Sequence, residues 1–210
     1  MTRQTIRATW QSAWQDSAIR RGLLITLPLL VVTLSVLARF LEGVEQRPGV
    51  VLSDPVLALF APHDVTWLTF LLIYAGLFGA IAILMHDPRR LLLAIHTYMF
   101  MVVFRMCAMS LLPLDPPQTM IPLTDPFVEY FGTGIPLSKD LFFSGHTSTL
   151  FLLGLTMQAH RWRTVFFFCT AAVACCVLIQ HIHYTVDVFV APFFAYTSYR
   201  LALSIHGRFF

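Results

Sequence analysis

Two short polar motifs contain the side chains that could carry out chemistry. Residues 139–147 read KDLFFSGHT and place His146 at the start of a strongly apolar run. Residues 181–187 read HIHYTVD, so His183 and Asp187 also lie between hydrophobic stretches. Ionisable residues inside such apolar sequence are rare and are usually functional. We therefore interpret the rest of the chain as a scaffold that brings the two motifs together.

The first motif predicts an anion-binding site at the start of a helix. Ser144 is a preferred N-cap residue, whose hydroxyl accepts a hydrogen bond from a first-turn amide. The amides that follow point outward with the positive end of the helix dipole, which favours an anion. Gly145 has no side chain to keep a ligand oxygen away from the backbone. The residues assigned to binding an anionic group are Ser144, Gly145, Thr147 and the neighbouring Lys139.

The second motif predicts an oriented imidazole. His183 and Asp187 are four residues apart, so in a helix they share a face. The carboxylate can accept a hydrogen bond from one ring nitrogen, which leaves the other nitrogen for nucleophilic attack or proton transfer. Three neighbouring polar residues are assigned a supporting role in the site: Asp140, His181 and Tyr184.

The sequence gives no indication of a metal or a cofactor. His181 and His183 are two residues apart and would point to different faces of a helix, which disfavours a zinc site built with His146. No nucleotide-binding glycine loop and no CxxC pair is present. Disulfides are not expected either, because the four cysteines lie inside apolar runs without ligand spacing. They are Cys107, Cys169, Cys175 and Cys176.

The composition predicts an all-α integral membrane protein. The chain has 210 residues, of which 57% are hydrophobic and 12% charged, and its mean hydropathy is +0.72. This is far more apolar than an average soluble domain. Six apolar runs are long enough to cross a membrane and lack the alternation of β-strands, so we expect a bundle of six helices. The runs are residues 22–40, 65–85, 91–112, 143–159, 164–180 and 184–203.

Charge placement predicts the orientation of this bundle. Ten arginines fall on one side of the six-span arrangement, whereas Arg39, Arg47 and Lys139 fall on the other. The positive-inside rule makes the arginine-rich side cytoplasmic, with both termini there and both histidine motifs near the outer side. The net charge of +3 reflects this topology, and we expect no nucleic-acid partner. The ten are Arg3, Arg7, Arg20, Arg21, Arg89, Arg90, Arg161, Arg163, Arg200 and Arg208.

Residues 1–21 form a separate segment before the six-helix membrane domain of residues 22–210. Ile6, Trp10 and Trp14 recur at a spacing of four with arginines between them, which is typical of a short cytoplasmic helix in the membrane interface. A frayed tail fits the same residues. The first apolar run also resembles a cleavable signal peptide, but its length suits an uncleaved first span better.

Arg105 lies inside the third apolar run, about two turns from its outer end. Such an arginine costs about 2.5–3.5 kcal/mol at the centre of a lipid-facing helix, so it must face something polar. It either pairs with a nearby carbonyl or carboxylate or fixes an anionic substrate, and we favour the second. His96, deeper in the same run, is interpreted as structural. The long proline-rich connection at 113–142 is predicted to act as a lid beside the site.

These stretches resemble the signature motifs of a known family. Residues 140–147 and 183–188 are similar to two motifs of the sphingomyelin synthase family, a membrane branch related to the type-2 phosphatidic acid phosphatases. The stretch from Arg105 to Pro113 is similar to a third and less specific motif. The resemblance implies a six-span fold and an outward-facing site. The catalytic triad that it implies consists of His146, His183 and Asp187.

The sequence departs from the wider superfamily in ways that change the expected substrate. Phe143 stands where a proline would precede Ser-Gly-His, no Ser-Arg pair precedes the second histidine, and no Lys-x6-Arg-Pro motif is present. These differences remove cationic phosphate ligands and leave Arg105 and Lys139 to supply positive charge. They shift the interpretation toward lipids of the synthase type.

We therefore hypothesise a membrane enzyme that cleaves a lipid phosphate ester. His183 would attack phosphorus to form a phosphohistidine, His146 would protonate the leaving alkoxide, and Arg105 would hold phosphoryl oxygens. A lipid alcohol acceptor such as ceramide or diacylglycerol makes the enzyme a phosphotransferase, and water makes it a plain lipid phosphatase. A protein that only binds or transports a lipid head group is the non-enzymatic alternative.

The expected partners are a membrane phospholipid and its acceptor alcohol or water. The chain lacks the N-terminal domain that some eukaryotic members of the family carry, so the resemblance does not imply the eukaryotic substrate pair. We expect a bacterial inner membrane with the site facing outward. The sequence leaves the head group, the acceptor and the oligomeric state open.

Overall fold

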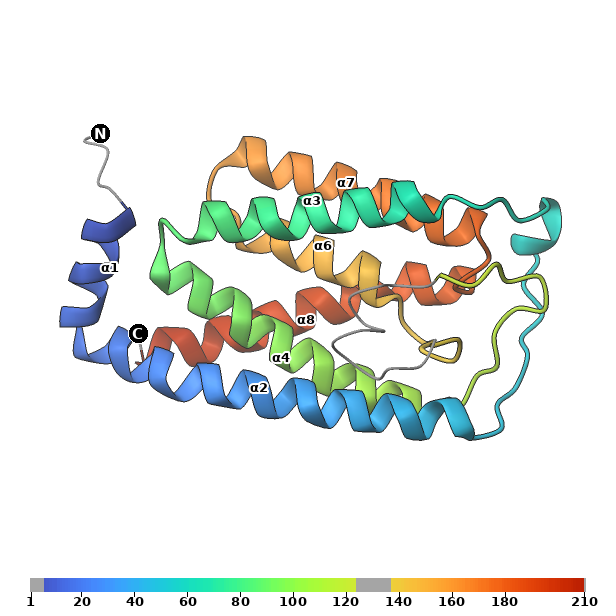
Figure 1. Ribbon diagram of the computed structural model, residues 1–210, viewed down its shortest axis with the longest axis horizontal. Coiled ribbons are helices and arrows are strands. Elements are labelled where there is room, and N and C mark those ends of the chain that lie inside the picture. Colours follow the sequence, from blue (N-terminus) through green and yellow to red (C-terminus); the bar gives the residue numbers. More distant parts are fainter. Residues whose placement is uncertain (1–5, 124–136, 210) are drawn as a thin grey trace.

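The computed structural model describes residues 6–123 and 137–209, which form a bundle of long helices (Figure 1). Within these ranges the secondary structure is helical apart from one isolated bridge between Val50 and Leu114, so the all-α prediction is confirmed. The elements are α1 (Ile6–Gln15), α2 (Ser17–Gln46), η1 (Leu57–Leu59), α3 (Thr66–Leu84), α4 (Pro88–Leu111), α6 (Gly145–Thr156), α7 (His160–Ile179) and α8 (Thr185–Phe209).

Local polar signals set where α2 and α4 begin. Asp16 caps α2, because its Oδ1 accepts a hydrogen bond from the amide of Ala18 at 2.9 Å. Asp87 caps α4 in the same way and accepts from the amide of Arg90 at 3.2 Å. Pro88 occupies the first position of α4, where its missing N–H is not needed. These caps separate each long apolar helix from the element before it.

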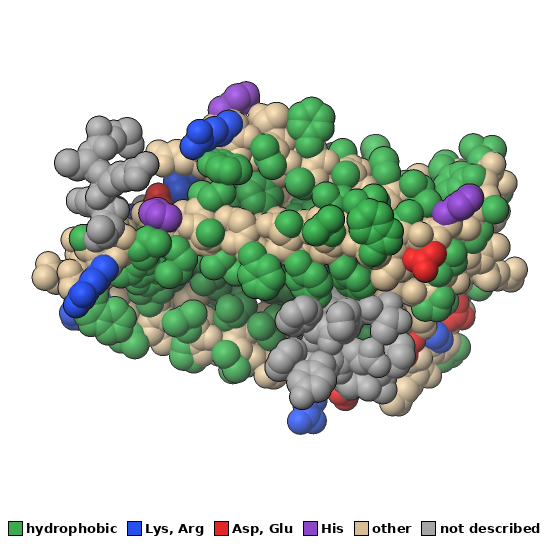
Figure 2. Space-filling model, turned by 45° about the horizontal axis from the view of Figure 1, so that its top comes forward, with side chains coloured by type: hydrophobic (Ala, Val, Ile, Leu, Met, Phe, Trp, Pro, Cys, Tyr) green, Lys and Arg blue, Asp and Glu red, His purple; other side chains and the backbone are tan. Residues whose placement is uncertain are grey.

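Five helices are long and apolar enough to cross a membrane: α2, α3, α4, α7 and residues 185–206 of α8. They correspond to five of the six predicted runs and support an integral membrane protein. Leu24, Ile25 and Val31 of α2 are exposed, as expected for a helix that faces lipid. Figure 2 shows hydrophobic side chains over most of the middle of one face of the bundle.

Six full-length spans are not confirmed, because the fourth apolar run forms the short helix α6. This helix has 12 residues and is about 18 Å long, whereas a hydrocarbon core is roughly 30 Å thick. Eight of its residues are buried. The chain reaches α6 through the non-helical residues 137–144. The run is therefore apolar because protein surrounds it, and apolar character alone does not distinguish this case from a span in lipid.

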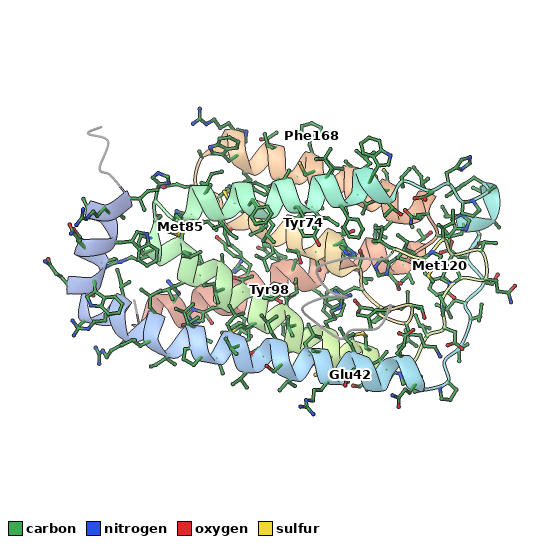
Figure 3. All side chains as sticks on the ribbon, in the orientation of Figure 1. Glu42, Tyr74, Met85, Tyr98, Met120 and Phe168 are labelled. Carbon is green, nitrogen blue, oxygen red and sulfur yellow. The ribbon has the colours of Figure 1, made fainter. Side chains whose placement is uncertain are left out.

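The core of the bundle surrounds α6. This helix packs most extensively against α7 and α8, and also against α3 and α4. The core there includes Phe143, Leu150 and Val173, each at most 1% exposed. α2 packs mainly on α4, at the edge of the bundle. Figure 3 shows the outer surface of α7 with Phe168 pointing away from the bundle.

The segment α1 and the end of α8 lie at the same end of the bundle (Figure 1). Trp10 donates from Nε1 to the carbonyl of Met85 at 2.9 Å, and Arg89 forms an ion pair with Asp16 at 3.0 Å. These contacts hold α1 and the start of α2 against the region where α3 ends and α4 begins. Residues 6–15 are thus helical, whereas their place in the membrane interface and the cytoplasmic side of this end stay predictions.

The opposite end of the bundle gathers the connections that carry the histidine motifs. Val50 donates to the carbonyl of Pro113 and accepts from the amide of Asp115, both at 3.0 Å. Gln180, which is fully buried at the end of α7, donates from Nε2 to the carbonyl of Ile121 at 3.3 Å. Three connections that are distant in sequence are therefore joined by hydrogen bonds at this end.

Candidate active site

The two histidine motifs meet where α6 and α8 begin. His146 is the second residue of α6, and His183 lies two residues before the start of α8. Their ring centroids are 6.5 Å apart, and the ring planes are inclined at 63°. The amide of Ser144 donates to the carbonyl of Asp187 at 3.1 Å, which joins the two motifs directly. The structure places all three residues of the predicted triad together.

Asp187 orients His183 from the first turn of α8. Its Oδ2 atom lies 3.3 Å from Nδ1 of His183 and accepts a hydrogen bond from the amide of Tyr184 at 3.2 Å. Both side chains are buried, with His183 2% and Asp187 0% exposed. A carboxylate in contact with Nδ1 favours the tautomer that carries its proton there, which leaves Nε2 for chemistry.

Ser144 caps α6, as the sequence predicts. Its hydroxyl accepts a hydrogen bond from the amide of Thr147 at 3.4 Å and another from the hydroxyl of Thr147 at 3.1 Å. Both residues are at most 1% exposed, so their hydroxyls stabilise the start of the helix. First-turn amides have no acceptor within the helix, and with the helix dipole they favour an anion at this point.

Arg105 from α4 lies against the start of α6. It is 8% exposed, and a Cβ atom added to Gly145 would lie 1.5 Å from its Nη1. The absence of a side chain at Gly145 predicts space for a ligand oxygen, but the structure shows the guanidinium of Arg105 there. The same guanidinium lies 5.9 Å from the ring centroid of Phe143. Glycine at position 145 therefore allows a cation from α4 to reach the helix start.

Asp140 is the partner of Arg105. Nη2 of the guanidinium lies 2.6 Å from Oδ1 of Asp140, and Nε donates to the same oxygen at 3.1 Å. Burial alone would raise the pKa of Asp140, but the charge and hydrogen bonds of Arg105, with His183 and His146 nearby, lower it below its ordinary value. Asp140 is therefore a carboxylate. Of the two roles left open for Arg105, pairing with a carboxylate is observed, and contact with substrate stays a prediction.

Lys139 contacts the connections at this end of the bundle, between α2 and α3 and between α4 and α6, and not the histidines. Its Nζ lies 2.8 Å from Oδ1 of Asp115 and donates to the carbonyl of Arg47 at 2.8 Å. The hydrogen bond from Lys139 lowers the pKa of Asp115. The structure thus separates Lys139 from the other residues assigned to anion binding.

Tyr184 and His181 also contact these connections, and both are only 1% exposed. The hydroxyl of Tyr184 donates to the carbonyl of Asp115 at 2.8 Å and accepts from the amide of Leu52 at 3.1 Å. Nδ1 of His181 lies 2.6 Å from Oγ1 of Thr119, and burial lowers the pKa of His181. The amide of Tyr184 contacts Asp187 directly, whereas the side chains of Tyr184 and His181 contact the connections and support the triad through the position of these connections.

Asp54 contacts the second motif, although its sequence context predicts no role in the site. Its carboxylate accepts a hydrogen bond from the amide of Thr185 at 2.6 Å and another from the hydroxyl of Thr185 at 3.0 Å. An Asp-Pro pair in a loop is an ordinary turn signal. Nothing in it indicates a contact with a residue 131 positions later.

The sequence disfavours a metal site and predicts a lid at residues 113–142. Among the described residues, no group of three or more His, Cys, Asp and Glu side chains is arranged to hold a metal ion. The lid predicted at 113–142 includes residues 124–136, which lie outside the described residues. Its role stays a prediction.

One protein-family model matches the part of the chain that carries both motifs. The family model described as PAP2 superfamily C-terminal matches residues 139–204, from Lys139 through most of α8. The match supports membership of the type-2 phosphatidic acid phosphatase superfamily and does not extend to the sphingomyelin synthase-like branch. No curated protein and no solved structure is significantly similar to the chain.

This match bears on the class of chemistry. Members of the superfamily are generally phosphatases or phosphotransferases, so the match supports an enzyme acting on lipid phosphates in a membrane. Arg105 and Asp54 lie outside the matched residues, and tertiary packing brings them to the site. Roles for individual residues therefore rest on the geometry.

Proposed function

We propose that this protein is a membrane enzyme that cleaves a lipid phosphate ester through a phosphohistidine and passes the phosphorus group to a lipid alcohol or to water. The observation that carries the proposal is the pair of imidazoles with different surroundings. His183 is held by Asp187, and His146 stands 6.5 Å away on a helix start beside Arg105. Binding alone does not require a histidine held by a carboxylate opposite a second histidine.

In the first step, Nε2 of His183 attacks phosphorus and forms a P–N bond. The P–O bond to the lipid breaks, and its electron pair leaves with the lipid oxygen. His146, as imidazolium, donates a proton to that oxygen, so the lipid departs as a neutral alcohol. Asp187 stabilises the positive charge that develops on His183, as the carboxylate does in other triads.

In the second step, the acceptor hydroxyl attacks the phosphohistidine. His146, now neutral, takes the proton of that hydroxyl while the P–N bond breaks and its electron pair returns to His183. The amides at the start of α6 and the guanidinium of Arg105 stabilise the phosphoryl oxygens in both steps. The cycle restores the starting protonation states of both histidines, whichever acceptor is used.

The charge of the site favours a phosphodiester as substrate. Among the described residues of the site, the cation Arg105 is already paired with Asp140, and Lys139 is paired with Asp115. A phosphodiester carries one negative charge, whereas a phosphomonoester carries about 1.5 to 2 at neutral pH. A site with little excess positive charge suits the smaller charge better. We infer that the transferred unit is a phospho-head group, with ceramide or diacylglycerol as the acceptor alcohol.

The test is an assay of the purified protein in lipid vesicles. Phospholipids labelled in the head group are supplied one at a time, with and without ceramide, and phosphatidic acid serves as the comparator. We expect release of diacylglycerol from at least one diester and appearance of label on the acceptor lipid. Release from phosphatidic acid alone would make the protein a plain phosphatase. Binding of lipid without any cleavage would make it a head-group binding protein.

The proposed site faces the outer side of a bacterial inner membrane, and thiol labelling tests this. In a background in which the four native cysteines are replaced by serine, Gln118→Cys at the motif end should react with an impermeant reagent added to intact cells. Arg163→Cys at the other end should react only after the cells are opened. The opposite pattern would reverse the orientation.

A further inference from the structure

The start of α8 lacks an N-cap side chain of its own. Thr185 is the first residue of the helix, and the residue before it is Tyr184. A capping residue is normally Ser, Thr, Asp or Asn, whose short side chain accepts from first-turn amides. The hydroxyl of Tyr184 instead forms hydrogen bonds with Leu52, which lies between α2 and α3, and with Asp115, which follows α4.

Asp54 supplies the missing acceptor from a distant part of the chain. Its Oδ2 accepts from the amide of Thr185 at 2.6 Å, while Oδ1 accepts from the hydroxyl of Thr185 at 3.0 Å and from the amide of Val56 at 2.9 Å. Burial alone would raise the pKa of Asp54, but the hydrogen bonds from Thr185, Leu57 and Val56 lower it. Asp54 is therefore charged at neutral pH, and its charge complements the dipole of α8.

Thr185 lies midway between the two residues that must keep their geometry. His183 stands two residues before it and Asp187 two residues after it, and their contact is 3.3 Å long. That contact depends on how the chain turns into α8, because Asp187 is in the first helical turn and His183 is outside the helix. A group that fixes the backbone of Thr185 therefore also fixes the relative position of the two side chains.

We propose that Asp54 is a positioning residue for catalysis, which holds the turn between His183 and Asp187 through Thr185. The inference rests on the proposed function for its effect on turnover. Asp54 lies in the connection between α2 and α3, outside the residues matched by the family model. Through it, the first half of the chain contributes directly to the alignment of the second motif.

The test compares matched Asp-to-Asn changes at two helix starts. Asp54→Asn keeps one side-chain oxygen, which can still accept from the amides of its own loop. The other oxygen becomes an NH2 group, which cannot accept a hydrogen bond from the amide of Thr185. Asp64→Asn is the control, because Oδ1 of Asp64 accepts from the amide of Thr66 at 2.9 Å at the start of α3, and the contacts described for Asp64 do not include residues 183–187. Thr185→Val, which removes only the hydroxyl contact, forms a milder second variant, with Thr197→Val on the same helix as its control.

Asp54→Asn is expected to lower kcat by about 10- to 100-fold with KM near the wild-type value, as for loss of a hydrogen bond to a charged group. Asp64→Asn should remain within about twofold of wild type. The kcat of Thr185→Val should lie between the values of these two variants. If Asp54→Asn matches Asp64→Asn in kcat, the positioning role is wrong.

A double-mutant cycle separates positioning from general support of the fold. If Asp54 acts by aligning Asp187 with His183, Asp54→Asn should have little further effect in an Asp187→Asn background. Independent, multiplicative losses would show that Asp54 acts on something else and would overturn the proposal.

A measurement that does not depend on activity separates this inference from the proposed function. Amide hydrogen exchange over residues 183–188 should be faster in Asp54→Asn than in wild type, and unchanged in Asp64→Asn. If wild type cleaves no lipid phosphate ester, the proposed function fails, yet faster exchange would still support Asp54 as the residue that holds this turn. Unchanged exchange would refute the inference even in an active enzyme.

Discussion

The two histidine motifs place similar side chains in different surroundings. His183 is 2% exposed and has a carboxylate oxygen 3.3 Å from its Nδ1. His146 is only half-buried and lies in the first turn of α6, next to the glycine on which Arg105 rests. One imidazole is thus oriented by an anion, whereas the other stands where an anion would bind.

This difference indicates a division of labour. A histidine whose Nδ1 is held by a carboxylate presents a defined lone pair at Nε2 and is suited to attack phosphorus. A histidine beside the phosphoryl oxygens is suited to exchange protons with the leaving group and the acceptor. The predictions below test this comparison, beginning with the change that should have the largest effect.

His183→Ala should remove the nucleophile and lower turnover by about 10⁴-fold or more. It should also abolish the covalent intermediate, which rapid quenching with phosphorus-labelled substrate detects as an acid-labile phosphoenzyme. The protein should still insert and purify, because the change removes a side chain and no backbone contact. Label that persists in His183→Ala and maps to His146 would reverse the two roles.

His146→Ala should lower turnover of a natural lipid by about 10²- to 10⁴-fold, the usual contribution of a general acid or base. A leaving group of low pKa does not need a proton, so the variant should recover part of its first-step rate with a nitrophenyl phosphate analogue of the lipid. His183→Ala is the control, since it should gain nothing from the better leaving group. Equal losses with both substrates would contradict the acid role of His146.

The helices themselves were largely predictable from the sequence, with one informative exception. The runs at 65–85 and 91–112 nearly coincide with α3 and α4, because hydrophobic length is a direct consequence of membrane thickness. The run at 143–159 contains several Ser and Thr residues beside its leucines and phenylalanines, and it forms the short buried helix α6. Burial by protein and burial by lipid select the same residue types, so the sequence did not distinguish them.

The same limit applies to the site. The Ser144 cap follows from a spacing of three residues, which local helix geometry determines. The spacing of four correctly paired His183 with Asp187, although His183 lies outside α8 and does not share a helix face with Asp187. The partners of Arg105 and Lys139 depend on how distant segments meet, and no local pattern specifies that. Asp54 was missed for the same reason, since its contact spans 131 positions.

Gly145→Ala sharpens the comparison by changing the surroundings of His146 without touching either histidine. The new Cβ would lie 1.5 Å from Nη1 of Arg105, so the guanidinium must move away from the helix start. We expect a loss of about 10- to 100-fold in kcat, somewhat less than for complete removal of an oxyanion donor. Gly79→Ala is the control, because among the described residues no atom beyond the adjoining backbone of α3 lies within 4 Å of the Cβ position there.

Arg105→Lys tests the same contact by changing the guanidinium itself. It keeps the charge but loses the planar fork that contacts Asp140, so it should also be poorly active while inserting normally. If Gly145→Ala and Arg105→Lys both retain turnover near wild type, the guanidinium plays no part in holding the phosphoryl oxygens.

Lys139→Gln should have the smallest effect, although Lys139 belongs to the same motif as His146. Its ammonium is already shared between Asp115 and the carbonyl of Arg47, at 2.8 Å from each, and these partners lie in the connections that follow α4 and α2. Removing a partly exposed ion pair of this kind usually changes little, so kcat and KM should stay within about threefold of wild type. The measurement is a steady-state comparison with Gly145→Ala in the same vesicles. A loss in Lys139→Gln as large as in Gly145→Ala would show that the ammonium leaves Asp115 and reaches the phosphate during turnover, and the site would then hold two cations in place of one.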